Sequence, residues 1–133
     1  MPAVRLFVLP VLILLLAGFD EARQLSVPAA GAPAERIAAL WQQTRPLLIA
    51  DVGQPLNDAQ SLARGAPVVD AWTGLQTSLA NTDESGEVHA VLKLLLDVYG
   101  RPEATPERRI ATRNDARRDF SQRLANVEGR MRH

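Results

Sequence analysis

The sequence predicts a small all-α protein, a bundle of four or five helices preceded by an N-terminal hydrophobic signal or anchor helix and a flexible linker. Apolar residues recur at steps of three and four over most of the chain, which is typical of helices packed on a core. Glycine, proline and capping residues divide this pattern into helix-sized segments. No segment alternates apolar and polar residues for long enough to indicate a strand.

The sequence divides the chain into three parts. We assign residues 1–22 to a signal peptide or membrane anchor and residues 23–33 to an Ala/Pro/Gly linker. Residues 34–133 form the helical body, and its basic C-terminal helix covers 105–132. The length of 133 residues limits the chain to one folded domain.

The N-terminal segment has the composition of an export signal. Arg5 precedes fourteen uncharged residues, Leu6 to Phe19. As a helix this run would be about 21 Å long, whereas the hydrocarbon core of a bilayer is about 30 Å thick. The run therefore suits a signal peptide better than a spanning helix, and Pro10 would kink a permanent span. A retained anchor and a buried core helix are the alternatives.

The first helix of the body is expected to begin near Pro33 and Glu35, since proline and an acid both suit a first turn. Pro46 should kink or end this helix, because it lacks the backbone N–H that a helix interior requires. Its apolar stripe, including the first tryptophan, contains Ile37, Leu40, Trp41, Thr44 and Leu48.

A short second helix is expected to begin at Asn57, an N-cap residue, with Leu56 as a hydrophobic staple. Gly65 and Pro67 should end it, and Pro67 would open a third helix. Four apolar residues then form a narrow helical seam on the third helix: Val68, Trp72, Leu75 and Leu79.

The fourth helix is expected to run from a cap at Thr82 or Asp83 to about Tyr99, before a stop signal at Gly100 and Pro102. Its apolar residues cover most of the helix circumference, which predicts a central helix buried on several sides. We therefore expect three leucines of this helix to be deeply buried: Leu92, Leu95 and Leu96.

The last helix has the clearest start in the chain, Thr105, Pro106 and Glu107, and should continue for twenty or more residues. From Arg101 onward the chain carries nine arginines and five acids, a balance of +4. Residues 20–100 carry ten acids and five basic residues, a balance of −5. An acidic body and a basic tail favour contact between this helix and an acidic surface.

The apolar seam of the last helix is thin, because Arg113 and Arg117 separate Ile110 from Phe120. A seam with seven-residue spacing suits a two-helix contact. We therefore expect the helix to bind a protein partner or a second copy of the chain. The candidate partner-binding residues are Arg109, Arg113, Arg117, Phe120, Leu124, Val127 and Met131.

The sequence offers little for catalysis. It contains no cysteine, which excludes thiolate metal sites and cysteine nucleophiles, and its only histidines are His89 and His133. We find no glycine-rich phosphate loop, nucleophile elbow or paired-histidine zinc motif, and we expect no cofactor and no bound metal. Nucleic acid is disfavoured, because the one aromatic residue of the basic helix, Phe120, lies on the apolar seam.

These observations predict an exported, non-enzymatic helical protein of the bacterial envelope that mediates protein–protein contact, as an accessory subunit of an envelope assembly or transport system. Its location would be periplasmic or otherwise extracytoplasmic, released after signal cleavage or anchored in the cytoplasmic membrane. Two alternatives stay open. One is a small enzyme or ligand carrier with a site between helices near His89, and the other is a binder of anionic surfaces through the arginine-rich helix.

The export prediction can be tested directly. A fusion of residues 1–32 to a reporter that is active only outside the cytoplasm should be active. Leu14→Arg should lower that activity, because a charge in the apolar run disfavours membrane insertion by about 2.5–3.5 kcal/mol. A reporter that stays cytoplasmic with the native segment would contradict the predicted location.

Overall fold

The computed structural model describes residues 24–131, which contain five α-helices and no strand. The all-α prediction is thereby confirmed for this part of the chain. The predicted signal or anchor, residues 1–22, lies outside the described residues. The helices are α2 (Pro33–Val52), α3 (Asp58–Ser78), α4 (Ser85–Tyr99), α5 (Pro106–Arg118) and α6 (Phe120–Met131).

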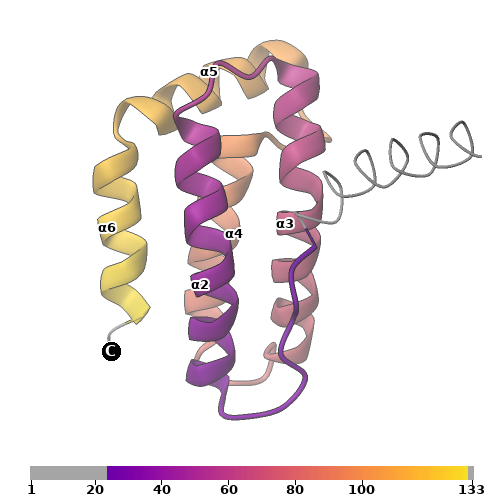
Figure 1. Ribbon diagram of the computed structural model, residues 1–133, viewed down its shortest axis with the longest axis vertical. Helices are drawn as coiled ribbons and strands as arrows, with labels where there is room; N and C mark the ends of the chain where they lie inside the picture. Colours follow the sequence, from indigo (N-terminus) through magenta and orange to yellow (C-terminus); the bar gives the residue numbers. More distant parts are fainter. Residues whose placement is uncertain (1–23, 132–133) are drawn as a thin grey trace, which may run out of the picture.

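Three of the helices stand side by side, and the last two wrap around them (Figure 1). α2, α3 and α4 run lengthwise, α5 lies across one end of the bundle, and α6 turns back along its side. α4 is the central helix, since it contacts each of the other four. Among the helices of residues 24–131, none is both long and apolar enough to cross a membrane.

Pro46 was expected to kink or end its helix and Pro67 to end one, and neither proline ends a helix. α2 continues through Pro46 to Val52, and α3 continues through Pro67 to Ser78, so the predicted second and third helices are one. Pro46 lies on the exposed face of α2, where water can solvate the carbonyl that proline leaves without a donor. The predicted cap of α3 is confirmed, because the Asn57 carboxamide accepts from the Gln60 backbone N–H at 2.8 Å.

Gly65 has a packing role in place of the predicted stop. A Cβ atom at this position would lie 2.4 Å from the Cβ of Tyr99. Any larger residue would therefore push α3 away from the last turn of α4, and the glycine is required for this close approach. Tyr99 itself is buried between the two helices, at 1% exposure.

The core is built from the predicted apolar seams. Both tryptophans are buried, and their rings meet edge to face with centroids 6.3 Å apart. The Trp72 indole N–H donates to the Thr44 hydroxyl at 2.8 Å, so its one polar atom is satisfied inside the core. Leu92 and Leu95 are buried as expected, but Leu96 is partly exposed because it lines open hollows beside α4.

The long C-terminal helix of the prediction is two helices. The chain turns at Asp119, between α5 and α6, so that α6 can run back along the bundle. A single straight helix crossing the bundle end would carry Leu124 and Val127 into solvent, whereas both are buried here at 9% and 7% exposure. Burying these apolar side chains favours the turn.

The segment before α2 is without regular structure, as expected of a linker, but it is attached to the body. Leu25 packs against the core, and the Ser26 backbone N–H donates to the Gln43 side chain at 2.8 Å. The carbonyl of Pro28 accepts from the Arg36 guanidinium at 3.0 Å. These residues of the predicted linker are therefore attached along α2.

Candidate functional site

One carboxylate joins the first turn of α3 to α5. Asp58 accepts from the Arg109 Nη2 at 2.7 Å and from the Arg113 Nη2 at 2.9 Å, and Arg109 Nε lies 3.0 Å from the same carboxylate. We call these three residues the Asp58 clamp. Hydrogen bonds from the two guanidinium groups hold the pKa of Asp58 far below its usual range, and the Asp58 carboxylate raises the pKa of Arg109.

The loop between α4 and α5 closes around the clamp. The Arg109 guanidinium donates to the carbonyls of Pro102 and Ala104, and Arg113 donates to the carbonyl of Tyr99 at 3.2 Å. Gly100 has a φ of +109°, and a Cβ there would lie 2.9 Å from Arg109 Cδ. The glycine thus provides both the turn and the room for the arginine.

A second buried carboxylate, Asp51 at the end of α2, lies at the same end of the bundle. It accepts from Arg64 at 3.0 Å and from the Tyr99 hydroxyl at 2.5 Å. Arg117 of α5 is half-buried nearby, where burial and the charge of Arg113 lower its pKa and the charge of Asp51 opposes this shift. These contacts tie α2, α3, α4 and α5 together by buried or half-buried charges.

The structure divides the predicted partner-binding residues into two groups. Arg109 and Arg113 are buried at 9% and 4% exposure by their contacts with Asp58 of the same chain. Ile110, the first residue of the predicted seam, is 45% exposed. The four apolar residues of α6 face the chain's own core: Phe120 and Met131 partly buried, Leu124 and Val127 buried. A role for these residues toward a partner stays a prediction.

A groove not predicted from the sequence runs between α4 and α6. It has a volume of about 410 Å³ and an apolar floor that includes Leu94 and Val127. Polar and charged side chains from both helices line it: His89, Lys93 and Asp97 of α4, and Arg123, Asn126 and Arg130 of α6. We call this hollow the α4–α6 groove.

The α4–α6 groove carries a positive charge. Its one acid, Asp97, already binds two arginines, Arg101 at 2.6 Å and Arg123 at 3.1 Å. Lys93 and Arg130 have no ion-pair or hydrogen-bond partner among residues 24–131. Two cations without an internal counter-charge therefore line an apolar floor, and an acidic ligand would complement them.

The position of α6, and hence the shape of the groove, is fixed by Glu128. Its carboxylate accepts from the Trp41 indole N–H at 2.9 Å and from Arg45 Nε at 2.9 Å, both on α2. Arg123 also bonds to Asp119, at the turn before α6, at 2.7 Å. These contacts orient α6 so that its basic side chains face α4.

One signal of the groove was present in the sequence. His89, Lys93 and Asp97 are spaced by four on a predominantly apolar helix, so they form its polar edge. Arg123, Asn126 and Arg130 are spaced by three and four on α6 and so also share a face. The sequence could not show that these two edges meet, because the turn at Asp119 was not recognised.

Within residues 24–131, no cluster of three potential metal-ligating side chains occurs. Comparison with known proteins gives no further guidance: no protein-family model, no curated protein and no solved structure matches this chain. The charge and shape of the α4–α6 groove are therefore the observations on which a function can be argued.

The Asp58 clamp predicts a specific dependence of stability on pH. Because the pKa of Asp58 is lowered in the folded chain, its ionised form stabilises the fold above the unfolded carboxyl pKa of about 3.9. This contribution is lost as the pH falls further. Asp58→Asn should therefore lower the free energy of unfolding at pH 6 and make it fall less steeply between pH 5 and pH 3.

Urea unfolding of the wild type, Asp58→Asn and Asp115→Asn at several pH values would measure this effect. Asp115 is a suitable control, because it lies on α5 with a 61% exposed side chain. Its variant should keep the wild-type dependence on pH. An Asp58→Asn protein with the same acid sensitivity as the wild type would show that the clamp does not contribute as proposed.

Proposed function

We propose that this protein is an exported, non-enzymatic helical protein that binds an acidic segment of another envelope protein. The binding surface is the α4–α6 groove. The single observation that carries the proposal is the pair of cations, Lys93 and Arg130, which line an apolar floor without a counter-charge from residues 24–131.

The groove suits a protein segment because it combines charge with apolar contact. Carboxylates of the partner would meet Lys93 and Arg130, and an apolar side chain would cover Leu94 and Val127. Charged contacts of this kind mainly steer and orient association, while the buried apolar contact contributes most of the affinity. The interaction should therefore weaken with added salt without being abolished.

The body supports this role as a rigid scaffold. Its buried or nearly buried carboxylates, Asp51, Asp58 and Asp97, each bind at least one arginine from a different segment. Among these contacts, the ion pair of Asp97 with Arg123 joins α4 directly to α6. A surface that is formed before a partner arrives loses less conformational entropy on binding. The location rests on the apolar run of Leu6 to Phe19 and Arg5, as argued from the sequence.

A photoreactive amino acid at position 126 tests the proposed surface. In cells that naturally make the full chain, it should crosslink to one protein that contains an acidic segment, whereas the same label at Thr77, on the exposed side of α3, should not. Arg130→Glu should reduce the crosslink at least about fivefold, because it reverses a charge facing the acid. Arg118→Glu, an exposed arginine outside the groove, should leave it unchanged.

Several results would contradict this proposal. The label at position 126 could capture lipid alone or a second copy of this chain, which would name a different occupant. Equal crosslinking from positions 126 and 77 would show that the contact is not specific to the groove. Equal effects of Arg130→Glu and Arg118→Glu would show that the groove charge does not select the partner.

A further inference from the structure

Two neighbouring hollows lie on either side of the end of α4, one toward α3 and one toward α5, and Leu96 and Gly100 line both of them. The apolar compartment, about 360 Å³, is lined mainly by α3 and the end of α4, with Leu62, Ala66 and Val69 among its walls. The cationic compartment, about 460 Å³, lies between Leu96 and the first turns of α5. We call the two together the Leu96 cleft.

The apolar compartment is open because the α3 residues beside it are small. Ala63 and Ala66 are exposed and leave the side of Leu96 uncovered. Leu96 is consequently partly exposed, although the leucines beside it in α4 are buried. The polar side chain of Asp70 lies among the lining residues, and the rest of the compartment is predominantly apolar.

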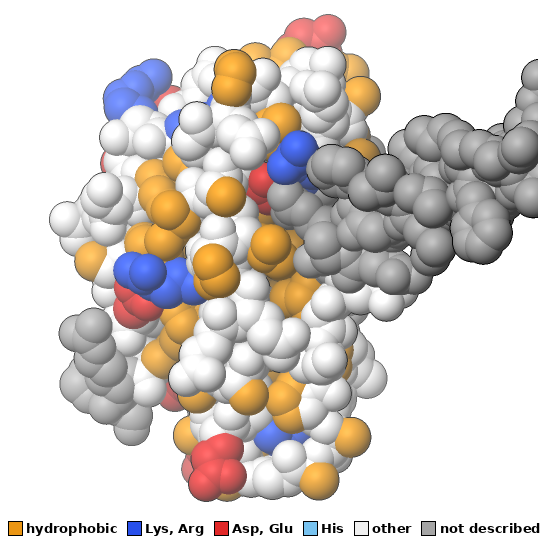
Figure 2. Space-filling view, viewed as in Figure 1, with side chains coloured by type: hydrophobic (Ala, Val, Ile, Leu, Met, Phe, Trp, Pro, Cys, Tyr) orange, Lys and Arg blue, Asp and Glu red, His pale blue; other side chains and the backbone are white. Residues whose placement is uncertain are grey.

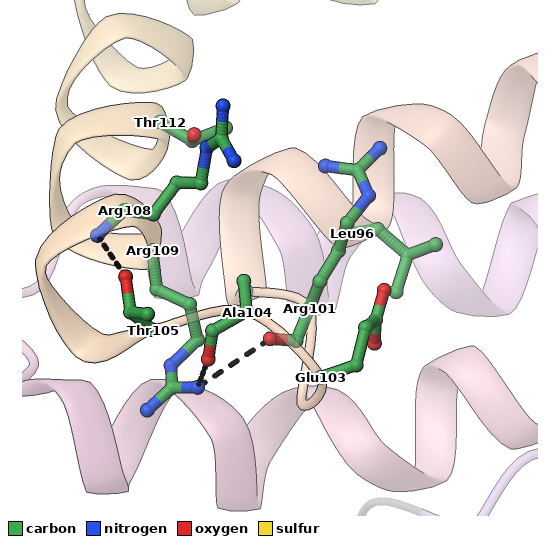
Figure 3. Close-up of a pocket in the computed structure, with 9 residues that line it drawn as sticks. Leu96, Arg101, Glu103, Ala104, Thr105, Arg108, Arg109 and Thr112 are labelled. Atoms are coloured by element: carbon green, nitrogen blue, oxygen red, sulfur yellow. Dashed lines mark hydrogen bonds between the residues drawn. The ribbon is translucent and has the colours of Figure 1, made fainter.

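The cationic compartment offers donors for one anionic group (Figure 3). Arg108 and Thr112 extend together from α5, and Arg101 extends from the end of α4 toward the same side of the hollow. Arg109 points the other way, into the loop carbonyls, and is engaged with Asp58. Glu103 lies nearer Leu96 and would repel an anion placed against it.

The charges of this compartment favour an anion between Arg101 and Arg108. Arg101 bonds to Asp97 through one nitrogen, Nη1, which leaves other guanidinium donors for a second acceptor. The Arg108 side chain forms no ion pair among residues 24–131. Two guanidinium groups and the Thr112 hydroxyl thus surround the hollow against one acid, Glu103.

We propose that the Leu96 cleft binds an anionic amphiphile, a single acyl chain with a carboxylate or phosphate head. The acyl chain would lie on Leu62, Ala66 and Leu96 and lose its contact with water. The head group would bind Arg108, Thr112 and Arg101, where a charge-assisted hydrogen bond is stronger than a neutral one. This site is separate from the α4–α6 groove and does not rest on the proposed partner.

A dodecanoate that carries a photoreactive group and a clickable tag tests the cleft. The full-length chain is expressed in cells, and labelling is carried out in the cell fraction that contains it. After illumination, labelled peptides should map to residues 62–70 and 96–112. Unlabelled dodecanoate and dodecyl phosphate should both compete, since either head group fits the cationic compartment. Dodecanol, which lacks the charge, and acetate or inorganic phosphate, which lack the chain, should compete at least about tenfold less well.

Two pairs of variants separate the cleft from nonspecific labelling. Ala66→Trp should fill the apolar compartment, and Arg108→Glu should reverse a charge of the cationic compartment. Each variant should lower the amount of crosslinked dodecanoate about fivefold or more. Ala59→Trp, also on α3, and Arg118→Glu, also on α5, are matched controls outside the cleft and should label normally. All four positions are exposed or lie on exposed faces, and resistance to limited proteolysis verifies folding.

Three outcomes would overturn the proposal. Label that maps outside the two peptides would show that the cleft is not the site. Equal labelling of Ala66→Trp and Ala59→Trp would show that no acyl chain enters the apolar compartment. Competition by dodecanol as strong as that by dodecanoate would show that Arg101 and Arg108 do not recognise the head group.

Discussion

The contact of Asp58 with Arg109 and Arg113 is the constraint on which the rest of this structure depends. This contact holds α5 across the end of the bundle. The two arginine side chains are buried there, and the Asp58 side chain is partly buried. Two guanidinium groups share one carboxylate, so removing the acid would leave two cations in a site with little water. Breaking a contact of this kind costs far more than an exposed ion pair contributes. The clamp therefore specifies where α5 lies.

Both candidate binding surfaces follow from that placement. The cationic compartment of the Leu96 cleft lies between α4 and α5, and one of its arginines, Arg108, directly precedes Arg109 of the clamp. The α4–α6 groove exists because the chain turns at Asp119 and α6 returns along α4. Figure 2 shows basic side chains and apolar surface interspersed on one face of the molecule.

The charge pattern shows what the sequence can and cannot indicate about the contacts of the basic helix. The basic tail and the acidic body do meet, as their opposite charges suggest, but they meet within one chain at Arg109, Arg113 and Asp58. Spacing along a helix shows which residues share a face and cannot show whether their counter-charge belongs to the same chain or to another. Arg130 and Lys93, which the sequence did not single out as site residues, have no ion pair within residues 24–131.

The helical elements were predictable to the extent that local chemistry determines them. The caps at Asn57 and Thr105, the stop at Gly100 and the buried stripe of α4 were all visible in the sequence, because each depends on residues a few positions apart. Pro46 and Pro67 misled the prediction, since tertiary packing and solvent access compensated for a lost backbone bond.

The turn at Asp119 and the closeness of Gly65 to Tyr99 were not predictable, because both depend on residues brought together by folding. A helix turn without glycine or proline leaves little trace in a single sequence. The position of the turn is determined by the free energy gained when Leu124 and Val127 are buried against the core. The local sequence pattern does not reveal where that core lies. The candidate groove was missed for the same reason.

Hydrogen exchange of Asp58→Asn and wild-type protein tests the central claim most directly. If the clamp holds α5 in place, amides of α5 and α6 should lose protection by about tenfold or more in the variant, while amides in the middle of α4 change less. That pattern would show a local opening of the last two helices. Equal loss of protection in all helices, or no loss in α5, would contradict the claim that this contact positions them.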